Sequence, residues 1–213
     1  MKDNMIIENK NKIIPKDGFN PNIYIKNLSF SYDGINEILR DINLTIRKNR
    51  KICIKSISGR GKTTLIKILL KLYSNKKRGE ILLDEINIDD IEIKYYYEKL
   101  ISYVGQEPIL FNGSIRDNLL NKSVGIYNTL LEDFYDEREE SERKLSGGQR
   151  QRVCICRSLL RDTKIIIMDE PTSGLDKVNI EKLKEIIRKE DRTMIIVSHD
   201  EGMEDVCNSS FSI

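Results

Sequence analysis

Apolar and polar residues alternate in several segments of this chain, whereas other apolar segments are short and almost continuous. Residues 23–32 and 38–46 alternate like half-buried strands on either side of an Asp33–Gly34 turn, and 80–88 is expected as one further strand of this kind. Near-continuous apolar segments are typical of strands that are buried on both faces. These segments are residues 51–55, 101–104, 165–168 and 193–197.

Segments with helical character separate these strands. Residues 65–73 place apolar side chains on one helical face, and 179–189 is expected as another helix. Residues 107–145 are helical in character but more polar, with a helix start at Ser114 and a solvated acidic stretch at 136–143. The alternation of strands and helices predicts an α/β domain whose parallel sheet is covered on both faces.

Length and composition are those of an ordinary soluble domain. The 213 residues fit one large domain, and 33% of them are charged. A net charge of +2 gives no reason to expect nucleic acid as a partner. No apolar run approaches the length of a membrane span, and the first residues do not form a secretory signal. Residues 1–22 are polar and broken by proline and glycine, which predicts a tail or linker.

Four cysteines raise the question of a metal site. The spacing of Cys154 and Cys156 is not that of a zinc site, and His199 is the sole histidine. The chain has no alanine, so cysteine can occupy small core positions instead. We therefore interpret the cysteines as core residues of a protein from a reducing compartment.

A glycine-bearing loop, SISGRGKTT at 56–64, lies between a predicted strand and a predicted helix. In such a loop the backbone N–H groups wrap a nucleotide phosphate, the lysine reaches the outer phosphates and the next hydroxyl binds Mg²⁺. Ser56 stands where the usual motif has its first glycine. The alternative is a turn beside an exposed lysine. The candidate phosphate-binding residues are Ser56, Ser58, Gly59, Arg60, Gly61, Lys62, Thr63 and Thr64.

Two carboxylates, Asp169 and Glu170, end the apolar strand at 165–168. Open α/β sheets bind ligands at the carboxyl ends of their strands. Asp169 is therefore expected to hold Mg²⁺, and Glu170 to orient or deprotonate the attacking water. The alternative is a polar strand end that leads into the turn at Pro171.

The segment Leu145–Arg152, LSGGQRQR, is here called the signature segment. Ser146 and Gln149 have the spacing of a helix capping box, so a capped helix is one interpretation. The functional interpretation adds anion binding, because Gly147 and Gly148 leave the first backbone N–H groups of the helix accessible.

These motifs together resemble those of ABC ATPases. From Ile23 onward the chain carries SFSYDG, SGRGKTT, VGQEP, LSGGQRQR, IIIMDEPTSGLD and VSHD in the order of that family. The resemblance implies an ATP-binding domain over 23–213 with a P-loop NTPase fold. Its RecA-like, mostly parallel core sheet would be joined by an N-terminal antiparallel β subdomain and a short α-helical subdomain inserted at about 107–157.

The resemblance also implies roles for single residues in ATP hydrolysis. Tyr32 would stack on adenine, although a cross-strand aromatic is the alternative. His199 would contact the γ-phosphate, and its alternative is a strand-end histidine with a local partner. The implied catalytic residues are Glu170, His199, Gln106 and Lys62. The implied metal ligands for Mg²⁺ are Thr63, Gln106 and Asp169.

A second copy of such a domain is the implied partner. Ser146, Gly147, Gly148 and Gln149 would bind the ATP held by that copy, and Asp176 would act across the same interface. A transmembrane domain is the other implied partner, which would make the chain cytoplasmic and peripheral to a membrane. Residues 106–119 and the tail before Ile23 resemble fused exporters, so export of an unknown substrate is expected.

Three departures from the family pattern leave alternatives open. Ser56 replaces a glycine, the stretch from Gln106 to Ser146 is short, and the chain ends at Ile213 where similar proteins continue with a strand and a turn. A non-transport ABC ATPase is one alternative, and an ATP-binding regulatory module with little turnover is the other. The three tyrosines at 95–97 are expected to lie on a helix that packs onto the sheet.

Overall fold

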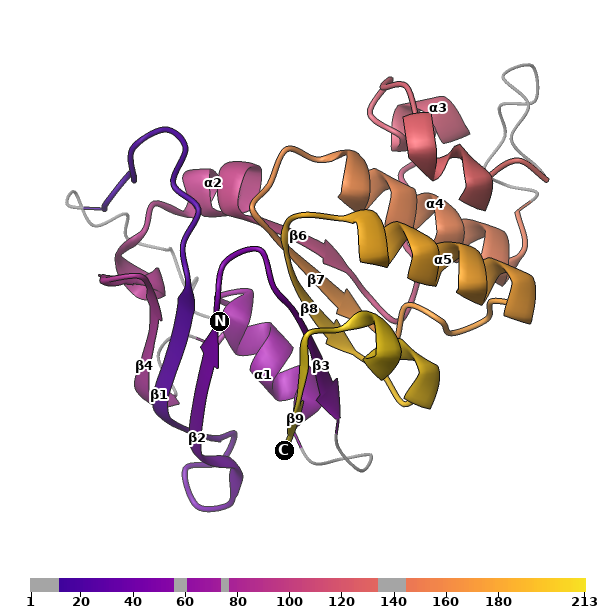
Figure 1. The fold of residues 1–213 in the computed structure, drawn as a ribbon. Coiled ribbons are helices and arrows are strands. Elements are labelled where there is room, and N and C mark those ends of the chain that lie inside the picture. The colour runs from indigo at the N-terminus through magenta and orange to yellow at the C-terminus, as the bar shows by residue number, and fades with distance from the viewer. Residues whose placement is uncertain (1–11, 56–60, 74–76, 134–144) are drawn as a thin grey trace, which may run out of the picture.

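The computed structural model describes residues 12–55, 61–73, 77–133 and 145–213, and it has two sheets with one helix between them (Figure 1). The smaller sheet is antiparallel, as expected for the N-terminal β subdomain. Its strands, in spatial order, are β2 (Glu37–Ile46), β1 (Ile23–Ser31), β4 (Lys77–Leu83) and β5 (Ile86–Asn87). Helix α1 (Lys62–Leu69) packs against this sheet with one side and against the larger sheet with the other.

The larger sheet is parallel throughout the described strands. In spatial order they are β6 (Ile101–Val104), β7 (Ile165–Asp169), β8 (Thr193–Val197), β3 (Lys51–Lys55) and β9 (Ser209–Ser212). Helices α4 (Gly147–Leu160) and α5 (Lys177–Lys189) cover the face opposite α1. The predicted fold class is therefore confirmed: a P-loop type α/β domain with a mostly parallel core, an antiparallel subdomain and an inserted helical region.

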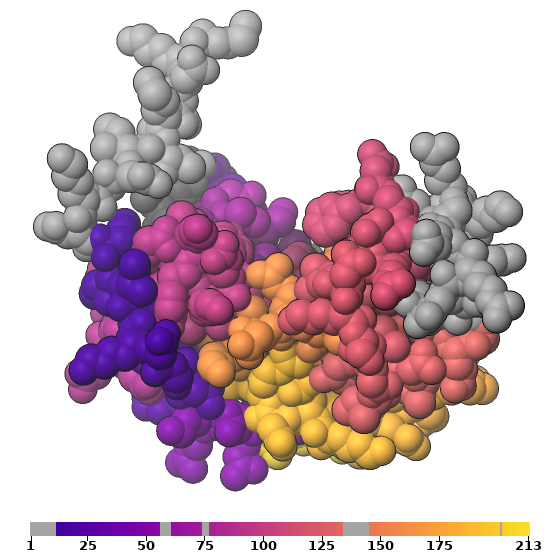
Figure 2. Space-filling model, turned by 90° about the horizontal axis from the view of Figure 1, so that it is seen from above, coloured from indigo at the N-terminus to yellow at the C-terminus, as the bar shows by residue number. Residues whose placement is uncertain are grey.

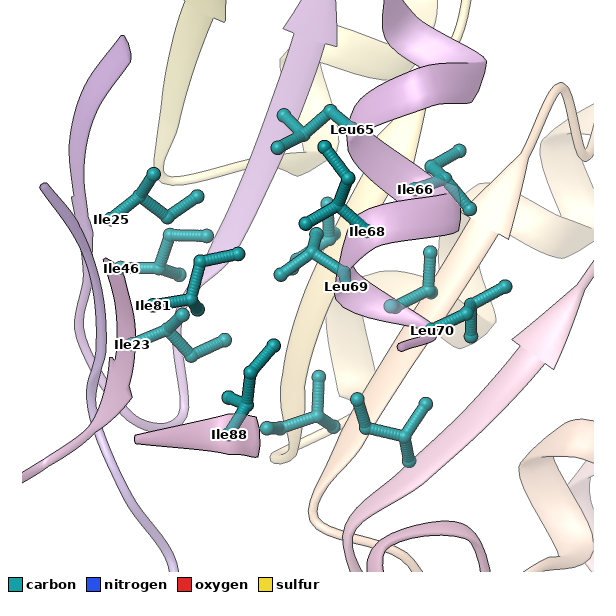
Figure 3. Packing of buried hydrophobic residues seen from close by; sticks show 14 of the residues in the cluster. Ile23, Ile25, Ile46, Leu65, Ile66, Ile68, Leu69, Leu70, Ile81 and Ile88 are labelled. Carbon is teal, nitrogen blue, oxygen red and sulfur yellow. The ribbon is translucent and has the colours of Figure 1, made fainter. Parts of the chain in front are cut away.

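Burial on both faces explains why the central strands are almost entirely apolar. In β7, Ile165 and Ile167 contact the α1 layer, whereas Ile166 and Met168 contact the layer of α4 and α5. Alternate side chains of a strand point to opposite faces, so both sets must be apolar here. Figure 3 shows the α1 layer, where Leu65, Ile68 and Leu69 extend toward the residues of the antiparallel sheet.

The segment predicted as one strand over 80–88 is two strands, so that prediction was wrong. Strands β4 and β5 form a hairpin around Asp84 and Glu85. Asp84 adopts a left-handed backbone conformation with φ of 51°, which turns the chain. Its carboxylate accepts hydrogen bonds from the backbone and side-chain N–H groups of Asn22, at 3.0 and 2.9 Å. The turn thereby also fixes the end of the N-terminal segment.

The described part of the inserted region before α4 is less helical than the sequence predicted. The capping box at Ser114 and Asp117 is present, but helix α3 (Ile115–Asn118) is only one turn long. It ends because Leu120 and Asn121 take left-handed conformations, with φ of 61° and 53°. A 3₁₀ helix, η4 (Gly125–Leu130), follows. The acidic stretch at 136–143 lies outside the described residues.

The described part of the N-terminal segment is not a free tail. Ile13 forms a β-bridge with Ile91, where the Ile13 backbone N–H donates to the Asp90 carbonyl oxygen at 2.8 Å. Phe19 packs against the core, and the Lys12 ammonium donates to the Asp89 carbonyl oxygen at 2.6 Å. Residues 12–22 therefore run along the antiparallel subdomain before β1 begins.

The last residues of the chain form a strand, although we expected from the sequence that the chain stops where similar proteins have one. After β8, the 3₁₀ helix η6 (Glu201–Val206) leads into β9, which pairs with β3 at the edge of the parallel sheet. The tyrosine segment also folds as expected, as α2 (Ile93–Tyr95) followed by the π-helical turn η3 (Tyr96–Leu100). Tyr96 is fully buried, and its hydroxyl donates to the Leu69 carbonyl oxygen at 2.6 Å.

Three of the cysteines are buried, and Cys207 is partly buried. Burial raises the pKa of Cys156 to about 12, so the thiol stays protonated and unreactive at neutral pH. Within the described residues no three His, Cys, Asp or Glu side chains converge as a metal site. A search of the same residues finds no helix that is both long and apolar enough to cross a membrane.

Candidate ATP-binding site

A cleft of about 680 Å³ lies at the carboxyl ends of β7 and β8, beside the start of α1. Its volume is in the range of small-molecule sites. It lies where open α/β sheets bind ligands, and we call it the nucleotide cleft. The residues that line it are Tyr32, Ile38, Gly61, Lys62, Thr63, Thr64, Gln106, Asp169, Glu170, Thr172, Ser173, His199 and Asp200.

Gly61 begins helix α1 in a conformation that only glycine adopts without strain. Its φ is 98°, and it serves as the residue before the first helical turn. A side chain at this position would place Cβ 2.7 Å from Cδ2 of Leu39, on β2. The glycine therefore allows α1 to start close to the antiparallel sheet, with Lys62 and Thr63 facing the cleft.

The two carboxylates leave β7 in different conformations. Asp169 is the last residue of the strand and is 5% exposed. Glu170 has a φ of 49°, which is a strained conformation for a residue with a side chain. Its backbone N–H donates to the Val197 carbonyl oxygen at 2.8 Å, which holds the chain in place at the end of β8. Such strain is characteristic of functional sites, where the surrounding structure maintains it.

Burial sets the electrostatics of Asp169. Removal from water, and the nearby Glu170 carboxylate, raise the pKa of the Asp169 carboxyl above its ordinary value. The Lys62 ammonium opposes this rise. A buried carboxylate whose ionised form is disfavoured gains strongly from a cation, and the cleft therefore favours a bound metal ion at this position.

Lys62, His199 and Glu170 form a connected set. The Lys62 ammonium lies 2.7 Å from Nε2 of His199, and that nitrogen lies 3.4 Å from Oε1 of Glu170. An ammonium can only donate, so Nε2 accepts and the imidazole proton lies on Nδ1. The His199 backbone N–H donates to Oε2 of Glu170 at 3.1 Å. Oε1 of Glu170 is buried and accepts no hydrogen bond within the described residues.

Tyr32 directly follows β1 and lines the cleft. Its hydroxyl is 3.0 Å from the Thr64 hydroxyl, and its ring meets those of Phe30 and Tyr73 edge to face, with centroids 4.9 and 5.5 Å away. The side chain is nevertheless 42% exposed. Tyr32 thus packs on neighbouring aromatic residues and also lines the cleft, and its stacking on adenine stays a prediction.

The predicted metal ligands share the cleft and have suitable chemistry. Thr63, Gln106 and Asp169 supply hydroxyl, amide and carboxylate oxygens, which are the ligand types that Mg²⁺ prefers. Magnesium usually takes only one or two protein carboxylates and completes its shell with water and phosphate. The residues therefore fit the ion.

The signature segment does not line this cleft. Ser146 caps α4, with the Gln149 backbone N–H donating to Ser146 Oγ at 3.2 Å and the Ser146 N–H donating to Gln149 Oε1 at 2.8 Å. Gly147 is exposed, whereas Gly148 packs on the loop before α5, where an added Cβ would lie 2.5 Å from the Gly174 carbonyl oxygen. Asp176 caps α5 and likewise does not line the cleft.

Figure 2 shows the molecule from above, with the N-terminal elements in indigo to magenta on one side and the inserted region in rose on the other. The orange and yellow segments of the parallel sheet and its helices lie between them. The helix of the signature segment is part of this central region and packs against η4 of the inserted region. The cleft and the signature segment are thus separate features of one chain.

The sequence and the structure agree on most of the cleft. Four predicted residues, Ser56, Ser58, Gly59 and Arg60, lie outside the described residues. Four lining residues were not predicted: Ile38, Thr172, Ser173 and Asp200. The last three adjoin predicted residues in the motifs DEPTSGLD and VSHD, so their proximity was a usable signal. Ile38 comes from β2, and no motif in the sequence indicated that it would line the cleft.

Comparison with known proteins identifies the family. The family model for ABC transporters matches residues 39–173. The chain is 36% identical to the lactococcin-G-processing and transport ATP-binding protein of Lactococcus lactis subsp. lactis, with 94% of this chain and 31% of that protein covered. It is 34% identical to the pediocin PA-1 transport/processing ATP-binding protein of Pediococcus acidilactici, covering 88% of this chain and 29% of that protein.

A solved structure extends the similarity to three dimensions. A bacterial Atm1-family ABC exporter with ATP bound superposes with a TM-score of 0.83 at 26% identity, over 96% of this chain and 39% of that one. This chain spans about three tenths of the length of the bacteriocin transporters that it matches. The sequence, the fold and the cleft agree with these comparisons: the chain belongs to the ABC transporter family, as one of its ATP-binding domains.

Proposed function

We propose that this chain hydrolyses ATP with Mg²⁺ and that two ATP-binding domains close around the nucleotide to power export. One observation carries the proposal. The cleft brings Lys62, the pair Asp169–Glu170 and His199 together from three places in the sequence, while the signature segment lies outside it. The groups proposed to carry out hydrolysis thus lie in the cleft. The N-terminus of α4, which has the features of an anion-binding site, lies outside it.

Lys62 and its neighbours bind the phosphates in this proposal. The ammonium, now 2.7 Å from His199 Nε2, would turn to the β- and γ-phosphates, which are stronger acceptors. This would leave His199 Nε2 free to face the γ-phosphate. The Thr64 hydroxyl and Gly61 border the same part of the cleft, and Tyr32 offers its ring to adenine.

The metal ion would be held by Thr63, Gln106 and Asp169. When bound, Mg²⁺ neutralises negative charge on the phosphate oxygens and offsets the burial that now disfavours the Asp169 carboxylate. The three ligands come from α1, from the residues after β6 and from β7. Movement of the inserted region relative to the core would therefore alter the position of Gln106.

Glu170 orients the attacking water and accepts its proton. Its Oε1 atom is buried in the cleft wall and has no hydrogen-bond donor among the described residues. Water attacks the γ-phosphorus, the bond to the bridging oxygen of ADP breaks, and inorganic phosphate forms. Lys62 and His199 stabilise the charge on the transferring group.

The signature segment would complete the site of a second copy. Ser146 and Gly147 are exposed at the start of α4, where backbone N–H groups and the helix dipole favour an anion. The chain's own cleft does not contain them. A head-to-tail dimer, with each signature segment placed on the partner's ATP, satisfies both observations.

In this proposal a transmembrane domain responds when the two ATP-binding domains close around the nucleotide and open again. The relatives described above are named as transport proteins, and this chain matches only part of each. Large apolar side chains are exposed just beyond Gln106: Ile109 is 71% exposed and Phe111 is 62% exposed. This patch supports docking of a membrane partner beside the inserted region. We place the domain at 23–213, with 1–22 as a linker and the chain on the cytoplasmic side of the membrane.

ATP hydrolysis by the purified chain tests the proposal. We expect Mg²⁺-dependent release of phosphate whose rate per chain rises with protein concentration, because the complete site needs two copies. Phosphate can be measured with and without a chelator over a range of protein concentrations. A chain that binds ATP tightly but releases no phosphate at high concentration would instead support the regulatory alternative.

A further inference from the structure

We propose that Arg152 is a positioning residue that holds the signature segment and the loop before Asp176 together as one surface. The inference rests on the proposed function, because that surface is the part of the chain offered to the partner's ATP. Arg152 is near the first turns of α4 but points inward, and its side chain is 6% exposed. It does not line the nucleotide cleft.

Arg152, on α4, contacts two other parts of the fold, the inserted region and α5. Its Nη1 atom donates to the Leu130 carbonyl oxygen at 3.0 Å and to Oδ1 of Asn179 at 3.1 Å. Its guanidinium also pairs with both carboxylate oxygens of Asp133, with Nη2 to Oδ2 at 3.0 Å. These hydrogen bonds lower the pKa of the Asp133 carboxyl. The inserted region, α4 and α5 therefore meet at one side chain.

Asn179 carries this connection to Asp176. Its backbone N–H donates to Asp176 Oδ1 at 2.8 Å, and its side-chain amide donates to Asp176 Oδ2 at 2.9 Å. These bonds hold the Asp176 carboxylate at the start of α5 and lower its pKa. Arg152 binds the amide oxygen of the same side chain, and this fixes the orientation in which the amide nitrogen faces Asp176.

A backbone contact supplies the second link between the same two segments. Gly148 approaches the Gly174 carbonyl oxygen so closely that an added Cβ would lie 2.5 Å from it. Gly174 has a φ of 73°, so its own conformation also favours glycine. The signature segment and residues 174–176 thus touch directly at Gly148 and are connected indirectly by Arg152 through Asn179.

The chemistry of this position requires arginine. A planar guanidinium can bind a carboxylate with two parallel hydrogen bonds and still donate to carbonyl oxygens on its edge, whereas an ammonium cannot hold that geometry. Buried networks of this kind are specific because each member depends on the others. Loss of Arg152 would remove the buried link between α4 and Asp176 and leave the contact of Gly148 with Gly174 to hold the two segments.

The test compares variants in a Glu170→Gln background, which keeps ATP bound. We expect Arg152→Met to bind ATP as the parent does but to dimerise at least about tenfold more weakly, the size expected for one lost network interaction. Arg152→Lys should recover only part of this loss. Arg188→Met, an exposed arginine on α5, is the matched control and should dimerise like the parent. ATP affinity is measured on the monomer by calorimetry and dimerisation by sedimentation.

A second variant keeps the proposal testable if Arg152→Met does not fold. Asn179→Ala removes the link to Asp176 and leaves the Arg152–Asp133 pair, and we expect the same split between unchanged ATP affinity and weakened dimerisation. Dimerisation of Arg152→Met or Asn179→Ala at parental strength would overturn the inference. A parent that binds ATP yet stays monomeric would instead contradict the proposed function on which it rests.

Discussion

Glu170→Gln is expected to lower the ATP turnover of this chain by at least about a hundredfold, the usual contribution of a positioned base. The amide cannot accept the proton of the attacking water. It retains an oxygen that can accept the His199 backbone N–H, so the local structure should persist. Binding of ATP should be unchanged, because the groups that hold its phosphates remain.

Phosphate release and nucleotide binding, measured on the same preparation, separate these two effects. Glu185→Gln is the matched control, since Glu185 is exposed on α5 and lies outside the cleft. It should hydrolyse ATP at the parental rate. Near-normal turnover by the Glu170 variant would contradict the assignment of Glu170, and the base would have to be sought elsewhere in the cleft.

Lys62→Met is expected to weaken ATP binding by about ten- to a hundredfold, because charged hydrogen bonds contribute about 1.5–3 kcal/mol each. Lys62 is only 9% exposed and faces the cleft beside His199. A methionine there can still pack, so the fold should be preserved while the positive charge is lost. Turnover should fall at least as much as binding.

Equilibrium binding of ATP measures this effect, with Lys48→Met as the control at an exposed lysine between β2 and β3. The control should bind ATP like the parent. If Lys62→Met bound ATP with parental affinity, the start of α1 would not be the phosphate site. The cleft would then need a different ligand.

The sequence was sufficient where the pattern of burial is strong. The apolar run at 165–168 must be buried on both faces, and β7 is so buried, with Asp169 at its end. It was misleading where the pattern is weak. Asp84–Glu85 is not a familiar turn pair, and apolar residues on both sides continued the alternation, so the hairpin of β4 and β5 appeared as one strand.

Long-range contacts account for most of what could not be predicted. Lys62 and His199 meet although 137 positions separate them, and only the family motifs indicated that they would. No motif indicated Ile38, or the link from Arg152 to Asn179 and Asp133. Periodicity assigns a residue to a face of a helix or strand, but the side chain that it meets there depends on how the elements pack.

ATP-driven association of the Glu170→Gln protein tests the central claim, which is that the cleft and the signature segment are halves of one site supplied by two chains. Analytical ultracentrifugation should find a monomer without nucleotide and a dimer with saturating ATP and Mg²⁺. Adding Ser146→Glu, which places a negative charge where the partner's γ-phosphate is expected, should leave ATP binding intact and abolish the dimer. A protein that is saturated with ATP but remains monomeric, or a Ser146→Glu variant that dimerises equally well, would contradict the claim.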